Sequence, residues 1–129
     1  MEESKQINQV IDVLMLAGTL LIESGSEIHR VEDTMIRIAH SQGIVDCNVL
    51  AMPVAIFFSI ENANVTRMKR ILRTNYNIEK VCDVNQISRQ LVSGEIDLEQ
   101  ACSLYQSPVD HCGNPQCAFL LHHVWRKFL

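Results

Sequence analysis

Apolar residues near the start of the chain recur at helical spacing and predict two helices. Over about residues 4–23 they cover most of the helix circumference, which predicts a central, largely buried helix. A second helix follows and runs to about Ser41. The positions expected on its inner face are Ile28, Val31, Met35, Ile38 and Ala39.

Residues that begin and end helices lie at the boundaries of these two segments. Gly25 stands where the first helix would stop and the chain turn, and Gly43 stands just after the second helix. Ser24 and Glu27 have the spacing of a capping box for the second helix, with Ser26 as a competing N-cap.

The pattern changes to that of strands between residues 45 and 72. Pro53 divides a β-rich stretch into a first strand over about 45–52 and a second over about 54–60. The second is almost continuously apolar, which predicts a strand buried on both faces. After a turn at 61–64, residues 65–72 are expected to form a third strand, antiparallel to the second.

Helical spacing returns after Asn75 and predicts a helix that ends at Gly94. Asp97 and Gln100 form a further capping box, which opens a last helix with Leu98, Ala101, Cys102 and Tyr105 facing inward. The predicted order is ααβββαα. It favours an α+β fold over residues 1–106, with two helices before and two after a small antiparallel sheet that they cover on one face.

Composition narrows the function classes. The chain has 129 residues, 20% charged and 47% hydrophobic, and its net charge of −4 argues against nucleic acid as a partner. No window reaches the ~20 apolar residues of a membrane span; the nearest is Val13–Ile22. The acidic start of the chain differs from a signal peptide. Five cysteines, an odd number, favour reduced thiols in the cytosol.

Two charged clusters are candidates for chemistry. In the first, His29 and Asp33 are four residues apart on the second helix, which would suit a proton relay or half of a metal site and hence an enzyme. The simpler interpretation is a solvated face whose acids suit the helix dipole. The second cluster comprises Arg67, Lys69, Arg70 and Arg73. It would contact anionic lipid headgroups or an anionic solute, or form the solvated side of an edge strand.

Residues 107–129 differ in composition from the rest and are expected to be an irregular or weakly helical tail. Cys112, Cys117, His122 and His123 are the right atoms for a tetrahedral zinc site, but their spacing fits structural zinc modules poorly. Zinc binding by these four residues defines the alternative function, a small soluble zinc-binding or regulatory protein.

Three stretches resemble the N-terminal domain of the threonine/serine exporter family of bacterial membrane proteins. Residues 20–39 contain the pattern G-[SA]-E-x-x-R-V-E, residues 51–60 are similar to the Pro-containing strand pair, and 66–71 follow it. Residues 77–101 resemble the segment N-L-x-K-[IV]…N-x-[IL]-S-R…G-x-[IL]-x-x-x-x-A. The first and third stretches are specific as a pair, in this order and at this separation.

The resemblance implies a cytoplasmic domain that precedes a membrane half or pairs with a membrane-embedded partner subunit, in an assembly expected to be a homo-oligomer. The family exports threonine, serine or dicarboxylates, and is taken to use the membrane potential or a proton gradient. It therefore implies a transporter, with no enzymatic activity and no cofactor. The lack of a glycine-rich phosphate loop in this sequence agrees with that.

Several residues match the family's motifs by position: Gly25, Glu27, Arg30, Val31, Glu32, Pro53, Asn85, Ser88 and Arg89. Gly25 would let the chain turn between the first two helices. Arg30 and Glu32 are expected to form a polar network against the sheet or against the membrane half. Ser88 and Arg89 would join that network from the third helix.

The chain departs from the family near Gln106, where the first membrane helix would begin. Trp125 must be encoded by TGG and every Arg codon begins with A or C, so a reading one base later gives glycine there. Small residues of this kind suit a membrane helix. We therefore expect residues 107–129 to be out-of-frame sequence, and the chain to be a truncated exporter subunit that does not transport alone.

Overall fold

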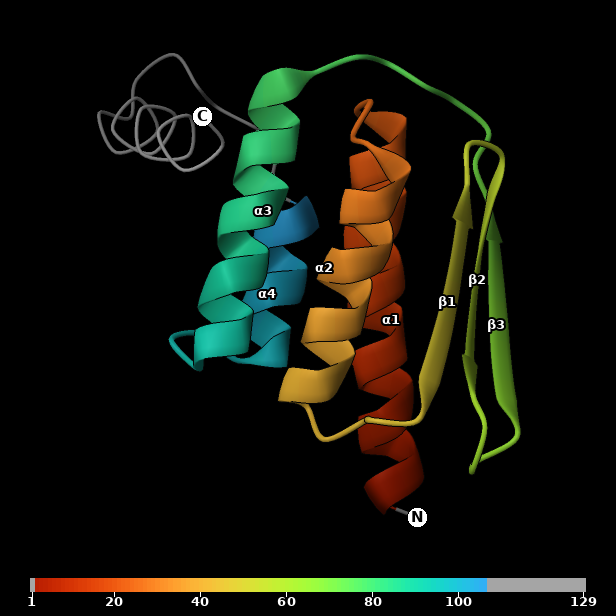
Figure 1. Cartoon of the computed structure of the whole chain (residues 1–129). Helices are drawn as coiled ribbons and strands as arrows, with labels where there is room; N and C mark the ends of the chain where they lie inside the picture. Colours follow the sequence, from red (N-terminus) through yellow and green to blue (C-terminus); the bar gives the residue numbers. More distant parts are fainter. Residues whose placement is uncertain (1, 107–129) are drawn as a thin grey trace.

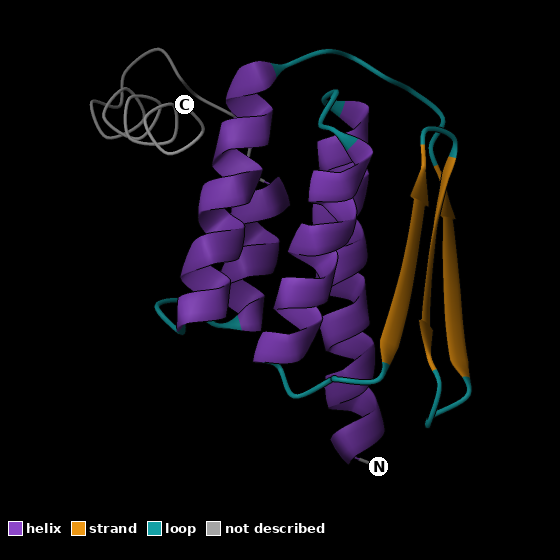
Figure 2. Ribbon diagram, viewed as in Figure 1, coloured by secondary structure: helices purple, strands orange, loops and turns teal. Residues whose placement is uncertain are grey.

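The elements follow each other as predicted: two helices, three strands and two helices. The computed structural model describes residues 2–106. The helices and strands are α1 (Glu2–Glu23), α2 (Ile28–Ser41), β1 (Cys47–Met52), β2 (Ala55–Ile60), β3 (Val65–Arg70), α3 (Ile78–Ser93) and α4 (Leu98–Gln106). The sheet lies against α1 and α2, and α3 and α4 pack on the other side of these two helices, away from the strands (Figures 1 and 2). This arrangement confirms the α+β prediction.

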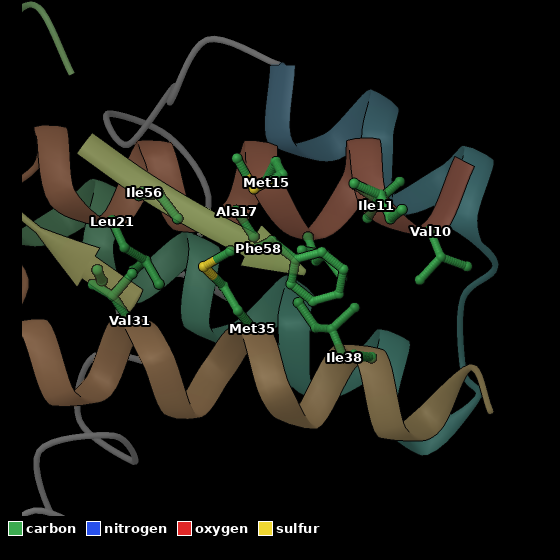
Figure 3. Close-up of a cluster of buried hydrophobic side chains, with 14 of the residues drawn as sticks. Val10, Ile11, Met15, Ala17, Leu21, Val31, Met35, Ile38, Ile56 and Phe58 are labelled. Carbon is green, nitrogen blue, oxygen red and sulfur yellow. The ribbon is translucent and has the colours of Figure 1, made fainter. Parts of the chain in front are cut away.

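Helix α1 is central, as its apolar circumference predicts, because it contacts the other three helices and both β2 and β3. Figure 3 shows its side chains meeting those of α2 and β2 in the core. Gly18 allows the closest approach, since a Cβ at this position would collide with the sulfur of Met35. The inner face of α2 is also as predicted, with Val31, Met35, Ile38 and Ala39 buried.

Helix α1 also resembles a membrane-spanning helix in its length and apolar composition. Glu3–Glu23 is the one helical stretch in the described part that is long and apolar enough to cross a bilayer by length and composition, which corrects the expectation that no window reaches this length. More than half of that stretch is buried inside the protein. Core helices of soluble proteins meet the same criteria, so length and composition alone do not make α1 a span.

The sheet is antiparallel with strand order β1-β2-β3. Pro53 lies in the two-residue turn between β1 and β2, as predicted, and β3 ends two residues earlier than expected. The N–H of Ile71 still donates to the carbonyl of Val54 (2.8 Å).

The prediction that the second strand is buried on both faces is wrong. Ile56, Phe58 and Ile60 are buried, but Phe57 is 36% exposed. Phe57 pairs with Leu50 on β1 and Met68 on β3, both more exposed still. All four helices lie on the other face of the sheet, so nothing in the described residues covers this row.

The end of α1 explains why the predicted cap of α2 is also wrong. Glu27 is the N-cap of α2 and makes no side-chain capping bond. Gly25 has a φ of 90°. This left-handed turn directs the N–H of Ser26 back to the carbonyl of Leu21 (2.9 Å). Ser24 and Ser26 therefore end α1 and do not begin α2.

The capping box of the last helix is confirmed. The N–H of Gln100 donates to Oδ1 of Asp97 (2.7 Å), and the N–H of Asp97 donates to Oε1 of Gln100 (3.0 Å). Gly43 and Gly94 follow α2 and α3 with φ angles of 87° and 84°, as their predicted stop positions require.

Candidate functional site

A cleft of about 300 Å³ lies between α2 and α3. Residues of α2 form one wall and residues of α3 the other, and every lining residue except Val92 has a polar or charged side chain. The lining residues are Arg30, Asp33, Thr34, Arg37, Asn85, Ser88, Arg89, Val92 and Ser93. We call this the α2–α3 cleft.

The charges of the α2–α3 cleft are mostly positive. Three guanidinium groups and one carboxylate line it. Arg37 is bonded to Asp33 (Nε to Oδ2, 3.0 Å), and Arg30 lies 3.8 Å from Glu27 (Nε to Oε2), outside the lining. Arginine binds carboxylates and phosphates through parallel hydrogen bonds. The excess of positive charge therefore suits a small ligand that carries a carboxylate.

Ser88 forms part of the cleft wall, but its hydroxyl is used inside the protein. It donates to the carbonyl of Val84 (2.7 Å) and lies 2.7 Å from the hydroxyl of Tyr105 on α4. Because a serine has a single hydroxyl proton, Tyr105 is the donor of the second bond. Burial raises the pKa of Tyr105 to about 12, against a smaller lowering by Ser88. Ser88 thus ties α3 to α4.

The structure brings together four of the six predicted polar site residues: Arg30, Asn85, Ser88 and Arg89. Glu27 stands beside them through its pair with Arg30. Glu32 is half-buried and does not line the cleft. The lining residues come from α2 and α3, including Ser88 and Arg89, which were expected to join Arg30 from the third helix, and none of them comes from the sheet.

The two structural positions lie elsewhere. Gly25 sits beneath the ring of Tyr76, beside a second hollow of about 260 Å³ that Arg30 also lines. Pro53 is in the β1–β2 turn, on the side of the molecule that the sheet forms.

Sequence reasoning missed four residues of the cleft: Val92 and Ser93 on α3, and Thr34 and Arg37 on α2. Thr34 and Arg37 lie on the helix face of Arg30, because residues four and seven positions later return to the same side of a helix. A polar stripe at this spacing was the signal that could have found them. The candidate i,i+4 pair of His29 with Asp33 is not formed: His29 is exposed and Asp33 bonds to Arg37, as in the simpler interpretation of a solvated helix face.

The basic cluster on β3 is divided between two faces, as its alternation predicts, and β3 is an edge strand. Arg67 is not on a solvated side, however. It reaches across to α1, where its Nη1 lies 2.7 Å from Oδ1 of Asp12 and its Nη2 donates to Asn8 (3.4 Å). It therefore fastens the edge of the sheet to the central helix.

The four candidate zinc ligands, Cys112, Cys117, His122 and His123, lie outside the described residues. Within residues 2–106, no group of three or more His, Cys, Asp or Glu could hold a metal ion. The thiols of Cys47, Cys82 and Cys102 are free. Burial raises the pKa of the Cys47 and Cys82 thiols.

Comparison with known proteins identifies one family. A family model for threonine/serine exporters matches residues 12–104, from the middle of α1 almost to the end of α4. The match includes every residue that lines the α2–α3 cleft. Comparisons with curated proteins and with solved structures gave no match.

Proposed function

Because the chain belongs to the threonine/serine exporter family, we propose that residues 2–106 form the cytoplasmic domain of a secondary exporter and bind the carboxylate of its solute in the α2–α3 cleft. The domain works with a membrane half or a membrane-embedded partner subunit, in a homo-oligomeric assembly at the cytoplasmic face of the membrane. The solute is threonine, serine or a dicarboxylate, and the domain carries out no chemical reaction on it.

One observation carries this proposal. Arg30 belongs to one family-like stretch and Asn85, Ser88 and Arg89 belong to another, yet all four line the same cleft. Polar residues gathered from separate stretches into a concave site are typical of ligand binding. A solvated helix surface would not require the two stretches to face each other.

The chemistry of the lining supports a carboxylate ligand. Arg30 and Arg89 stand on opposite walls, so a carboxylate between them would accept hydrogen bonds from both helices. The Asn85 amide and the Thr34 hydroxyl would then bond the hydroxyl or second carboxyl group of the solute. A ligand that joins α2 to α3 in this way would report the cytoplasmic solute level to the membrane half.

The binding step is tested by titrating the full chain with succinate, threonine and serine in a calorimeter. Arg30→Gln and Arg89→Gln should each weaken binding about tenfold or more, because each removes a charge-assisted hydrogen bond worth about 1.5–3 kcal/mol. Arg73→Gln is the matched control, since Arg73 is exposed and outside the cleft. Equal affinities for all three variants, or no binding of any solute, would contradict the proposal.

The proposal for residues 107–129 has its own test. We propose that they are out-of-frame sequence in place of the first membrane helix, which the change of composition after Gln106 and the forced glycine at codon 125 support. Sequencing the DNA across codons 100–129 and beyond decides it. A second frame that continues into hydrophobic segments of spanning length is the expected result, and its absence would favour the zinc-binding alternative.

A further inference from the structure

Exposed apolar side chains gather at one end of the molecule. Four of the five most exposed large apolar residues of the described part lie there: Val54, Leu72, Tyr76 and Ile78, at 62%, 78%, 84% and 63%. In Figure 1 this is the upper end, where the β1–β2 turn, loop 71–77 and the start of α3 meet. An exposed apolar cluster of this kind marks a contact with another surface.

Hydrogen bonds hold this end in place. The N–H of Asn75 donates to the carbonyl of Glu23 (2.7 Å), and the N–H of Asn77 donates to the carbonyl of Ser24 (3.1 Å). Loop 71–77 is thus fastened along the end of α1. Its apolar side chains are held outward on a fixed backbone.

The same end is basic on its sheet side. Between residues 47 and 78 the only acidic residue is Glu61, which lies in the β2–β3 turn at the opposite end of the sheet. The acidic residues at the same end, Glu23, Glu27 and Glu79, belong to its helix side. Of the basic residues in that segment, Arg67 is paired with Asp12. Arg70 and Arg73 flank Leu72 and are exposed. We call Val54, Arg70, Leu72, Arg73, Tyr76 and Ile78 the loop-end surface.

The end of α4 lies beside the start of α3. Nζ of Lys80, in the first turn of α3, donates to the carbonyl of Tyr105, near the end of α4 (3.3 Å). This bond helps to fix the start of α3, which carries Ile78.

We propose that the loop-end surface docks on an anionic lipid bilayer. Arg70 and Arg73 would bond the phosphate groups of the lipids, while Val54, Leu72 and Tyr76 enter the boundary between headgroups and acyl chains. The net charge of the whole chain is −4, so attraction to an anionic membrane depends on this local patch. Docking is consequently reversible and weakens as salt concentration rises.

The test measures binding of the full chain to vesicles of phosphatidylcholine with and without 40% phosphatidylglycerol, taking about 40% as a strongly anionic bilayer. Binding is expected only to the anionic vesicles. Arg73→Gln should weaken it about fivefold, because a basic residue near an anionic surface contributes about that factor. Val54→Asn should weaken it roughly threefold through lost apolar contact.

Matched controls come from the opposite end of the molecule. Lys5 lies in the first turn of α1, and Val45, which is 66% exposed, lies between α2 and β1. Lys5→Gln and Val45→Asn make the same changes of charge and polarity as the two test variants, and should leave vesicle binding unchanged. Because residues 107–129 are identical in all four variants, any contribution from them cancels.

The proposal is overturned if anionic vesicles do not bind the chain, or if the two ends respond equally. It is also overturned if Val54→Asn changes the oligomeric state in an analytical ultracentrifuge while vesicle binding is absent, since the surface would then join two protein copies. Vesicle binding involves neither solute nor transport. Its failure would leave the proposed exporter function in place, and a failed solute titration would leave docking in place.

Discussion

Replacing Ser88 by alanine tests whether this residue holds α3 to α4. The substitution removes the acceptor for the hydroxyl of Tyr105, and Tyr105 is only 1% exposed. An unpaired buried donor costs about 1–3 kcal/mol. The carbonyl of Val84 does not become unpaired, because it still accepts the backbone N–H four residues later in α3. Ser88→Ala should therefore lower the free energy of unfolding by about 1–3 kcal/mol.

The partner substitution should be milder. Tyr105→Phe removes the donor and leaves the Ser88 hydroxyl bonded to Val84, so we expect a loss of about 0.5–1.5 kcal/mol. In the double variant no hydroxyl is left unpaired. It should be about as stable as Tyr105→Phe alone, which makes the coupling between the two sites about equal to the cost of Ser88→Ala.

Urea unfolding followed by circular dichroism measures these differences as shifts of midpoint at constant slope. In a chain of this size, 1 kcal/mol corresponds to roughly 4 °C in Tm. Ser93→Ala is the matched control, because Ser93 lies on the same helix and donates to a backbone carbonyl (3.1 Å) while exposed. It should change stability by about 0.5 kcal/mol or less. Additive single costs, or a Ser88→Ala cost as small as the control, would refute the reasoning.

Three further substitutions have expected outcomes. Gly25→Ala should lower the unfolding free energy by about 1–2 kcal/mol in urea titrations, because alanine is strained at a φ of 90°, whereas the Tyr76 ring is exposed and can move aside. Arg67→Ala should lower the free energy of unfolding by about 0.2–1 kcal/mol at low salt, because its ion pair with Asp12 is partly exposed. The loss should be smaller at ~1 M salt, since the Debye length then falls to about 3 Å and the ion pair is screened. Alkaline pH should destabilise the protein through Tyr105, whose folded pKa of about 12 exceeds the ordinary value of 10.0. This contribution is complete below pH 10 and falls by about 1.4 kcal/mol per pH unit between the two values.

Each of these predictions has a control. Gly43→Ala introduces the same backbone strain, at a φ of 87° with nothing near the new methyl group, so a much larger cost at Gly25 would mean that Tyr76 cannot move. A salt-independent cost at Arg67 would point to packing in place of charge. Tyr105→Phe should lose part of the alkaline sensitivity, and an unchanged pH profile would show that other groups cause it.

Local interactions account for the parts that sequence reasoning predicted well. The helical and strand segments follow from spacing that each segment carries by itself, and the Asp97–Gln100 box is made within one turn. The predicted N-cap of α2 was wrong because the local sequence fits two different roles. Ser24 and Ser26 are equally able to end one helix or begin the next, and the direction of the chain after Gly25 decides between the two.

About half of the residues that line the cleft could be named from the sequence. Arg30 and Arg89 were named from family-like stretches, and the face shared by Arg30, Thr34 and Arg37 follows from helical geometry. The spacing of residues along one helix does not predict which other helix packs against its polar face. Ser88 and Arg89 of α3 were expected to join Arg30 and Glu32 in one network, and the structure places both in one cleft with Arg30, whereas Glu32 does not line it.

The sequence by itself determined the elements, their order, the apolar face of each helix and the family of the chain, because these depend on neighbouring residues and motifs. The tertiary structure decided what covers each face. It left Phe57 partly exposed although its strand is almost continuously apolar, directed Arg67 to Asp12, and used the Ser88 hydroxyl for Tyr105. Such outcomes depend on contacts between residues that are distant in the chain. Hydrophobic periodicity does not predict which distant residue will contact a given side chain.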